Sequence, residues 1–245
     1  MPVYLSIDLG ILNLALCVVD IRTRSTEPKD IINDSKILSW NIETIGYNKE
    51  AMTFLIESIS NQVDQLLQKY SVDQVLIERQ HETNKQMVKL GYGLYGYLYG
   101  KKPTRFIKGT HKHLFCDAIN YERDGKGYST NKKTAVDAVT NIVQIMSDKH
   151  PKLMKKHVET FSDAKKQDDL ADCLLQAFAY HMKPPRVVKR RLNPPKRRTK
   201  VTKKSKPRKK VSKPRKRSNI TSSLLSCCSQ KKLEPTVEIL NSSSV

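Results

Sequence analysis

Acidic residues stand at the ends of three hydrophobic runs in this 245-residue chain. They are Asp8 in VYLSIDLG, Glu78 in VLIER, and Asp168, Asp169 and Asp172 in QDDLADCLLQAF. A carboxylate beside a buried strand or helix is costly unless a cation neutralises it. Because no Lys or Arg lies at a matching place in all three segments, a shared divalent metal ion is the partner that would explain them together.

The spacing of the apolar residues predicts an α/β domain. Alternating or continuous apolar runs predict five strands, over residues 2–9, 14–21, 36–45, 73–79 and 104–109. Apolar residues at steps of three and four predict four helices, over residues 50–70, 82–100, 131–146 and 167–182. The polar stretch 22–36 is predicted to be a loop. The order β-β-β-α-β-α-β-α-α is typical of a mixed five-stranded sheet flanked by helices.

The positive charge of the chain belongs to one segment. The positive and negative charges of residues 1–182 nearly balance, whereas residues 183–217 hold 19 Lys and Arg and no acid. The same segment has no aromatic residue and six of the 11 prolines. Such a segment buries too little apolar surface to offset the entropy of ordering, so residues 183–217 and the C-terminal 218–245 are predicted to be disordered. A basic tail attracts phosphate backbones and can also be a nuclear import signal; a solvated tail without a partner is the alternative.

Several classes of protein do not fit this composition. We expect no signal peptide, because the first strand begins at the N-terminus, and no apolar stretch approaches the roughly 18 residues of a membrane span. The chain contains no CxxC motif and no His/Cys spacing typical of zinc ligands, so we expect no zinc site. These features indicate an intracellular protein without a membrane partner or a small-molecule substrate.

The acidic residues have a spacing suited to metal-assisted chemistry. Asp8 and Glu78 are expected at the carboxyl ends of neighbouring parallel strands, and Asp169 and Asp172 on one face of a helix. Carboxylate oxygens are ligands that Mg²⁺ and Mn²⁺ prefer. Two such ions about 4 Å apart can activate water and stabilise the leaving oxygen in phosphodiester hydrolysis. The alternative for Asp168 or Asp169 is a helix N-cap.

Three motifs together resemble one family. SIDLGILNLA fits the D-x-G-x-x-N-x-A opening of the RuvC-like Holliday junction resolvases of poxviruses and other large DNA viruses, and VLIERQ and KKQDDLADCLL fit their second and third acidic motifs. The match covers about residues 2–180, with Leu12 where the family commonly has a Lys. The resemblance implies an RNase H-like fold, a homodimer and symmetric nicking of four-way DNA junctions during viral recombination and replication, in the host cytoplasm or nucleus.

The resemblance also assigns roles to residues. It implies that Asp8, Glu78, Asp169 and Asp172 are catalytic and hold two Mg²⁺ ions per active site, with Mn²⁺ as a substitute and Asp168 in a supporting part. The family places a functional lysine before the last motif, for which Lys133 is favoured over Lys132 and would stabilise phosphate charge in the transition state.

Two further surfaces are candidates for binding. In the Tyr- and Gly-rich segment 89–102, the spacing of Gly96 and Gly100 would let another helix approach, which suggests a dimer surface; stacking at the junction and packing on the chain's own sheet are the alternatives. Lysines and an arginine near the fifth strand, together with Lys132, are predicted to contact DNA phosphates. They are Lys101, Lys102, Arg105, Lys108 and Lys112.

The sequence leaves further functions open. The D-x-G-x-x-N pattern also opens the phosphate-binding hairpin of actin, heat-shock ATPases and sugar kinases, but those proteins duplicate the domain and this chain has one such hairpin. A less selective nuclease of the same fold and a non-catalytic basic DNA-binding protein also fit the sequence.

Overall fold

The computed structural model describes residues 1–121 and 127–184. The rest of the basic segment and residues 218–245 lie outside the described residues, so the disorder expected for them stays a prediction. Within the described part of the chain, no helix is both long and apolar enough to cross a lipid bilayer.

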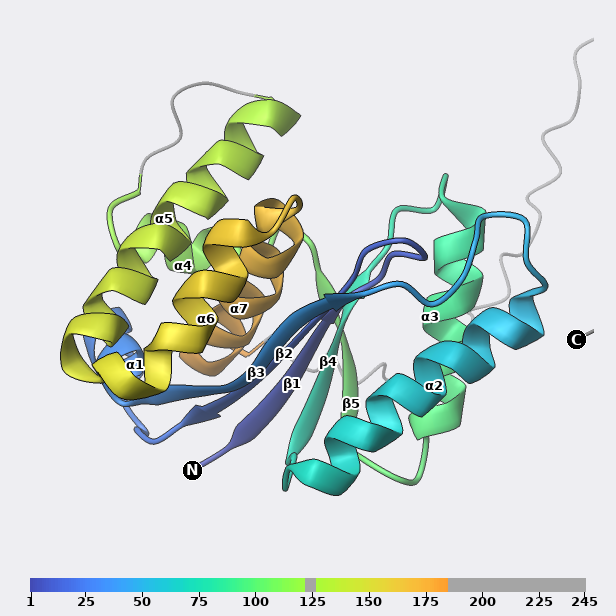
Figure 1. Ribbon diagram of the computed structural model, residues 1–245, viewed down its shortest axis with the longest axis horizontal. Helices are drawn as coiled ribbons and strands as arrows, with labels where there is room; N and C mark the ends of the chain where they lie inside the picture. The colour runs from blue at the N-terminus through green and yellow to red at the C-terminus, as the bar shows by residue number, and fades with distance from the viewer. Residues whose placement is uncertain (122–126, 185–245) are drawn as a thin grey trace, which may run out of the picture. The chain divides into compact units, whose positions relative to one another are not determined.

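The five predicted strands form one mixed sheet (Figure 1). They are β1 (Val3–Asp8), β2 (Leu14–Ile21), β3 (Ser35–Glu43), β4 (Gln74–Arg79) and β5 (Thr104–Lys108). Their order across the sheet is β3-β2-β1-β4-β5. The first three strands pair antiparallel as a meander, whereas β4 runs parallel to β1 and β5 runs parallel to β4. The carboxyl ends of β1, β4 and β5 therefore lie at the same edge of the sheet.

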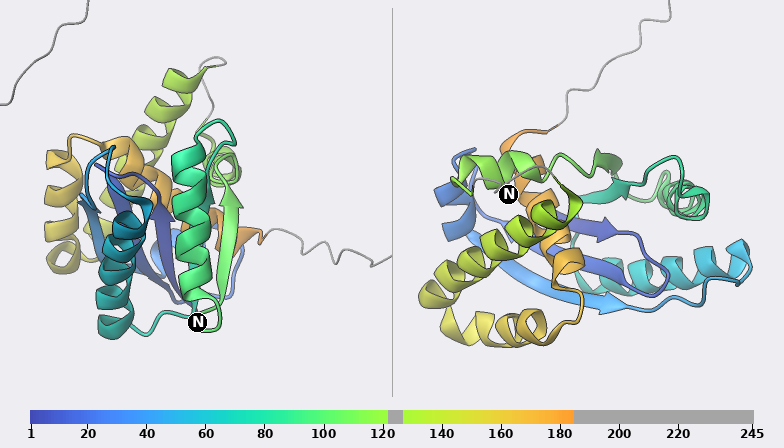
Figure 2. Two further views of the ribbon diagram at one scale, coloured as in Figure 1. Left: turned by 90° about the vertical axis from the view of Figure 1, so that its right-hand side faces the viewer. Right: turned by 90° about the horizontal axis from the view of Figure 1, so that it is seen from above.

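Helices cover both faces of the sheet, with α2 and α3 on one face and the others on the opposite face (Figures 1 and 2). The helices are α1 (Pro28–Asn33), α2 (Met52–Lys69), α3 (Lys85–Leu98), α4 (His113–Ala118), α5 (Tyr128–Lys149), α6 (Pro151–Asp163) and α7 (Gln167–Met182). Three of them were not predicted. The helices α1 and α4 are only six residues long, and α6 buries only Met154 and Phe161, so none presents a long apolar stripe.

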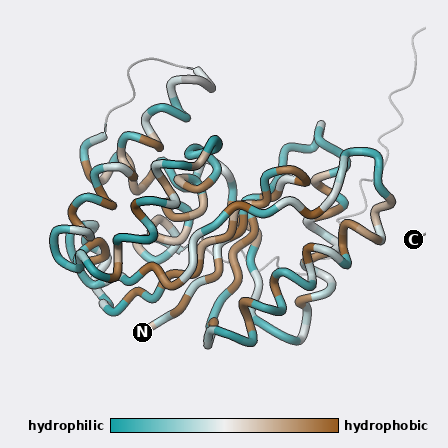
Figure 3. Tube along the Cα trace, viewed as in Figure 1, coloured by the Kyte–Doolittle hydropathy of each residue, from teal (hydrophilic) through white to brown (hydrophobic). Residues whose placement is uncertain are grey.

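Alternation along the strands divides the core into two clusters. Leu5 and Ile7 of β1 pack with α2 and α3, whereas Tyr4 packs toward α7 on the other face. Both faces of the central strands are covered, which explains why β2 is apolar along almost its whole length (Figure 3). On the α7 face, Ser6 and Asp8 follow Tyr4 at steps of two.

Polar contacts fix α7 on the sheet. The indole Nε1 of Trp40 donates to the carbonyl of Leu170 at 3.1 Å, and the amide Nε2 of Gln176 donates to the hydroxyl of Ser6 at 3.1 Å. Because Gln176 lies over the middle of β1 and the start of α7 lies nearer to Asp8, helix and strand run antiparallel. The N-terminal turns of α7 are thereby placed at the carboxyl end of β1.

Candidate active site

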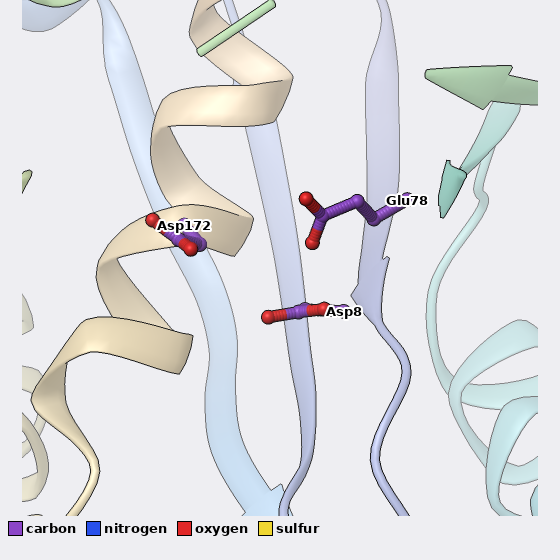
Figure 4. Close-up of side chains that lie close together, drawn as sticks. All are labelled: Asp8, Glu78 and Asp172. Atoms are coloured by element: carbon purple, nitrogen blue, oxygen red, sulfur yellow. The ribbon is translucent and has the colours of Figure 1, made fainter. Parts of the chain in front are cut away.

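Three carboxylates converge at the carboxyl edge of the sheet. Asp8 ends β1, Glu78 lies near the end of β4, and Asp172 lies in the second turn of α7. One oxygen from each lies within 4.8 Å of the others, and the side chains approach from two strands and a helix (Figure 4). The parallel register of β1 and β4 places Asp8 beside Glu78, as the sequence predicted.

The three groups are close enough to perturb one another. Burial, followed by the charges of Glu78 and Asp172, raises the pKa of Asp8 well above its ordinary value. Burial also raises the pKa of Asp172 to about 6, although Lys112 lowers it and Glu78 opposes that lowering. The charge of Glu78 therefore makes Asp8 and Asp172 harder to ionise, and a bound cation would relieve this repulsion.

Lys112 is a positive partner of the acidic cluster that the acidic motifs alone do not predict. Its ammonium forms an ion pair with Asp172 and lies 4.0 Å from Glu78 Oε1. Burial alone would lower the pKa of Lys112, but the charges of Asp172 and Glu78 outweigh burial and raise it. The sequence holds one signal for the position of Lys112, which follows the end of β5 by four residues. Because the parallel strands β1, β4 and β5 end at the same edge of the sheet, a residue just after β5 lies near Asp8 and Glu78.

The other two acids of α7 have different surroundings. Asp169 lines the same cleft but is not one of the three converging carboxylates, and burial followed by the charge of Asp168 raises its pKa. Asp168 forms an ion pair with Lys132, which lowers its pKa in spite of burial. Neither acid is the N-cap, which is Lys166; both lie in the first helical turn, where the helix dipole favours negative charge.

The two candidate lysines of α5 differ in position. Lys132 lines the cleft and pairs with Asp168, whereas Lys133 does not line it. The placement thus favours Lys132 as the functional lysine, whereas the sequence favoured Lys133.

The carboxylates open into a cleft of about 580 Å³. The amide Nε2 of Gln80 donates to Asp8 Oδ1 at 3.5 Å, and a Cβ added at Gly109 would lie 2.2 Å from Glu78 Oε1. Gly109 therefore leaves the space that the Glu78 carboxylate occupies. His81, His113 and Asn131 also line the cleft.

The residues expected to contact DNA do not form one patch. Lys101 and Lys102 lie before the start of β5 and Lys108 lies at its end, next to the cleft edge. The ammonium of Lys102 donates to the carbonyl of Val72 at 3.0 Å, and that of Lys101 lies 3.5 Å above the Tyr97 ring. Arg105 and Lys108 are exposed. DNA binding by the predicted set stays a prediction.

The Tyr- and Gly-rich helix α3 has a packed side and an open side. The Tyr95 ring stacks on Phe106, with ring centroids 5.2 Å apart. Tyr92 and Tyr99 are exposed, and nothing lies within 4 Å of a Cβ added at Gly96. The predicted helix 82–100 ends earlier, at Leu98, so Gly100 lies beyond α3 with a φ of +79° and its spacing from Gly96 does not fall within one helix.

The donor set fits a divalent metal ion. The converging ligand atoms are all carboxylate oxygens, which suit hard cations such as Mg²⁺, Mn²⁺ and Ca²⁺. No histidine or cysteine joins this group within the described residues.

The chain was compared with protein-family models, curated sequences and solved structures. The family model described as "Poxvirus A22 protein" matches residues 2–184, whereas no curated protein matches by sequence. The yeast mitochondrial Holliday junction resolvase Ydc2 is similar in structure, with a TM-score of 0.53 and 17% identity over 73% of this chain and 78% of that one.

Two other solved structures are similar at a lower score. The fowlpox virus resolvase in complex with substrate Holliday junction DNA has a TM-score of 0.49 and 19% identity over 73% of this chain and 96% of that one. Thermus thermophilus RuvC has a TM-score of 0.49 and 15% identity over 74% of this chain and 93% of that one. The family-model match over residues 2–184 shows that the chain belongs to the poxvirus A22 protein family, and the chain carries the three acidic motifs by which it resembles the RuvC-like Holliday junction resolvases.

Proposed function

We propose that this protein resolves four-way DNA junctions by metal-dependent hydrolysis of one phosphodiester in each of two opposed strands. The observation that carries the proposal is the convergence of Asp8, Glu78 and Asp172 in an open cleft. Membership of the poxvirus A22 protein family supports the same activity. The three carboxylates would hold a divalent ion, for which Mg²⁺ is the candidate, and Asp169 would contribute to a second.

A bound divalent ion would act as a Lewis acid that polarises the scissile phosphate and would lower the pKa of the attacking water. The protein residues hold the carboxylates in place before DNA arrives. Gln80 orients Asp8, and the space at Gly109 admits the Glu78 side chain. Such fixed ligands avoid reorganisation during the reaction.

Lys112 and Lys132 would contact the DNA phosphate. Both line the cleft, and each pairs with an acid of α7. With a cation on the carboxylates, Asp172 would attract the ammonium of Lys112 less strongly, and this ammonium could approach a phosphate oxygen. A positive charge placed there stabilises the charge that develops during hydrolysis. We propose Lys132 rather than Lys133 as the functional lysine of α5.

A second copy of the chain is the proposed protein partner, because paired nicks need two active sites. The proposed contact is the open side of α3, which we define as Tyr92 and Gly96 of the helix together with Tyr99, the residue directly after it. Tyr99→Glu is expected to shift the protein to monomer in analytical ultracentrifugation. Tyr47→Glu is the control, because Tyr47 is similarly exposed but does not belong to this surface. A Tyr99→Glu variant that sediments as a dimer would remove α3 from the interface.

The activity test compares an end-labelled four-way junction with a linear duplex of the same sequence, in Mg²⁺ or EDTA. Symmetric nicks in the junction alone, lost in EDTA and in Glu78→Gln, are the expected result. Equal cutting of the duplex would identify a less selective nuclease. Metal-replete binding without cutting would contradict the proposal.

A further inference from the structure

The side chain of Cys173, next to Asp172, contacts the sheet. The backbone N–H of Asp8 donates to its sulfur at 3.1 Å, and the thiol donates to the carbonyl of Ala15 at 3.1 Å. Cys173 is buried, with 1% of its surface exposed. A single sulfur atom therefore joins β1, β2 and α7 at the point where two carboxylates of the site emerge.

The two backbone groups belong to the base of one hairpin. Asp8 and Ala15 are opposite each other in the antiparallel register of β1 and β2. The turn between them is tight, since a Cβ at Gly10 would lie 2.4 Å from the carbonyl oxygen of Asn13. The Cys173 thiol thus holds α7 to a rigid part of the sheet rather than to a loose loop end.

We propose that Cys173 is a positioning residue whose hydrogen bonds set the spacing between the Asp8 and Asp172 carboxylates, and with it the affinity for the divalent metal ion. The inference rests on the proposed function of these carboxylates. Asp8 is held through its own backbone N–H, and Asp172 through the peptide bond to Cys173. One side chain therefore controls both ligands.

Metal binding is sensitive to such spacing. Mg²⁺ requires oxygen ligands close to octahedral positions at about 2.0–2.1 Å, whereas a shift of one residue along a helix moves a side chain by about 1.5 Å. Loss of a group that orients metal ligands typically weakens metal binding by about 10- to 100-fold. The contacts of Trp40 and Gln176 hold α7 on the sheet independently, so the fold is expected to survive loss of the thiol.

The test measures the dissociation constant of Mn²⁺ by isothermal titration calorimetry on the full chain. Cys173→Val replaces the thiol with two methyl groups and removes both hydrogen bonds, and it is expected to raise this constant by about 10-fold. Cys173→Ser can donate and accept at the same place and is expected to restore most of the affinity. Cys116→Val is the control, because Cys116 is equally buried in α4.

Junction cleavage against Mn²⁺ concentration provides a second readout. We expect Cys173→Val to need about 10-fold more Mn²⁺ for half-maximal rate, with a nearly unchanged rate at saturation. Wild-type Mn²⁺ affinity in Cys173→Val, or in Cys173→Ala should the valine variant not fold, would overturn the positioning role while leaving the proposed function intact. A wild-type chain that neither binds Mn²⁺ nor cleaves the junction would overturn both.

Discussion

The ammonium of Lys112 forms an ion pair with the carboxylate of Asp172 inside the acidic cluster. This lysine places a positive charge where a bound cation would also lie. It also lies within 4.0 Å of Glu78 Oε1, so it reduces repulsion between two of the three carboxylates. Metal ion and lysine therefore compete for the same negative charge, and this competition can be measured.

Replacing Lys112 with Met is expected to destabilise the metal-free domain. The substitution leaves Asp172 and Glu78 without their cation, and breaking a partly buried pair in this way costs about 1–3 kcal/mol. Urea unfolding in EDTA measures the loss, and added Mn²⁺ is expected to recover most of it. Lys133→Met is the control, because Lys133 lies on the neighbouring helix α5 and does not line the cleft. Equal stability of both variants in EDTA would show that the ion pair contributes nothing.

The ionisation of Asp172 is expected to lower the stability of the metal-free domain between pH 4 and about 6.5. The folded pKa of Asp172, about 6, lies above its ordinary value of 3.8, so the folded state holds a proton that the unfolded state releases. This stabilisation is complete below pH 4 and is lost as the pH rises through 6. Asp172 alone contributes on the order of 1–3 kcal/mol. The pKa of Asp8 is raised as well, so the ionisation of Asp8 also lowers the stability as the pH rises.

Asp172→Asn tests this dependence. The variant cannot ionise at residue 172, so its urea unfolding in EDTA is expected to show a smaller loss of stability between pH 4.5 and 7.5 than that of the wild type. The same variant is expected to lose junction cleavage by at least about 10³-fold while still binding the junction, because the lost group holds metal rather than DNA. If the stability of Asp172→Asn changed with pH as much as that of the wild type, Asp172 would not be the titrating group. Loss of junction binding in the variant would contradict its role as a metal ligand.

Gly109→Ala is expected to disturb Glu78 directly. A Cβ there would lie 2.2 Å from Glu78 Oε1, so the carboxylate must move away. Because a misplacement near 1 Å can cost about 100-fold in rate, we expect a loss of that order in junction cleavage with the fold retained in circular dichroism. Gly127→Ala is the matched control, since the nearest atom to its added Cβ is Thr130 Oγ1 at 3.9 Å. Equal activity in the two variants would rule out this steric role.

Removing residues 185–245 is expected to weaken junction binding and reduce its salt dependence. Lysines and arginines that neutralise phosphates release counterions, so each contact makes log K fall by about 0.9 per unit of log salt concentration. A truncated protein should still cleave the junction at low salt, because all residues of the cleft precede residue 185. An inactive but folded truncation would show that the tail belongs to the site.

The strands and long helices could be predicted from the sequence because each carries a repeated burial pattern. Alternation in β1 and the apolar run of β2 reflect a sheet covered on both faces, and α2 has a continuous apolar stripe. Short helices have no such repeat: α1 and α4 bury two side chains each, and only their neighbours in the fold make them helical.

The sequence by itself predicted which acids lie at the carboxyl edge of the sheet, because each stands at the end of a buried run. Asp8, Glu78 and Asp172 converge there, whereas Asp169 lines the same cleft. Tertiary structure decided which charges meet. Lys112 reaches Asp172 across 60 residues of chain, Lys132 rather than Lys133 lines the cleft, and the Cys173 sulfur ties Asp8 to α7. Periodicity reports which face of an element is buried, whereas the partner on that face depends on how elements far apart in the chain pack together.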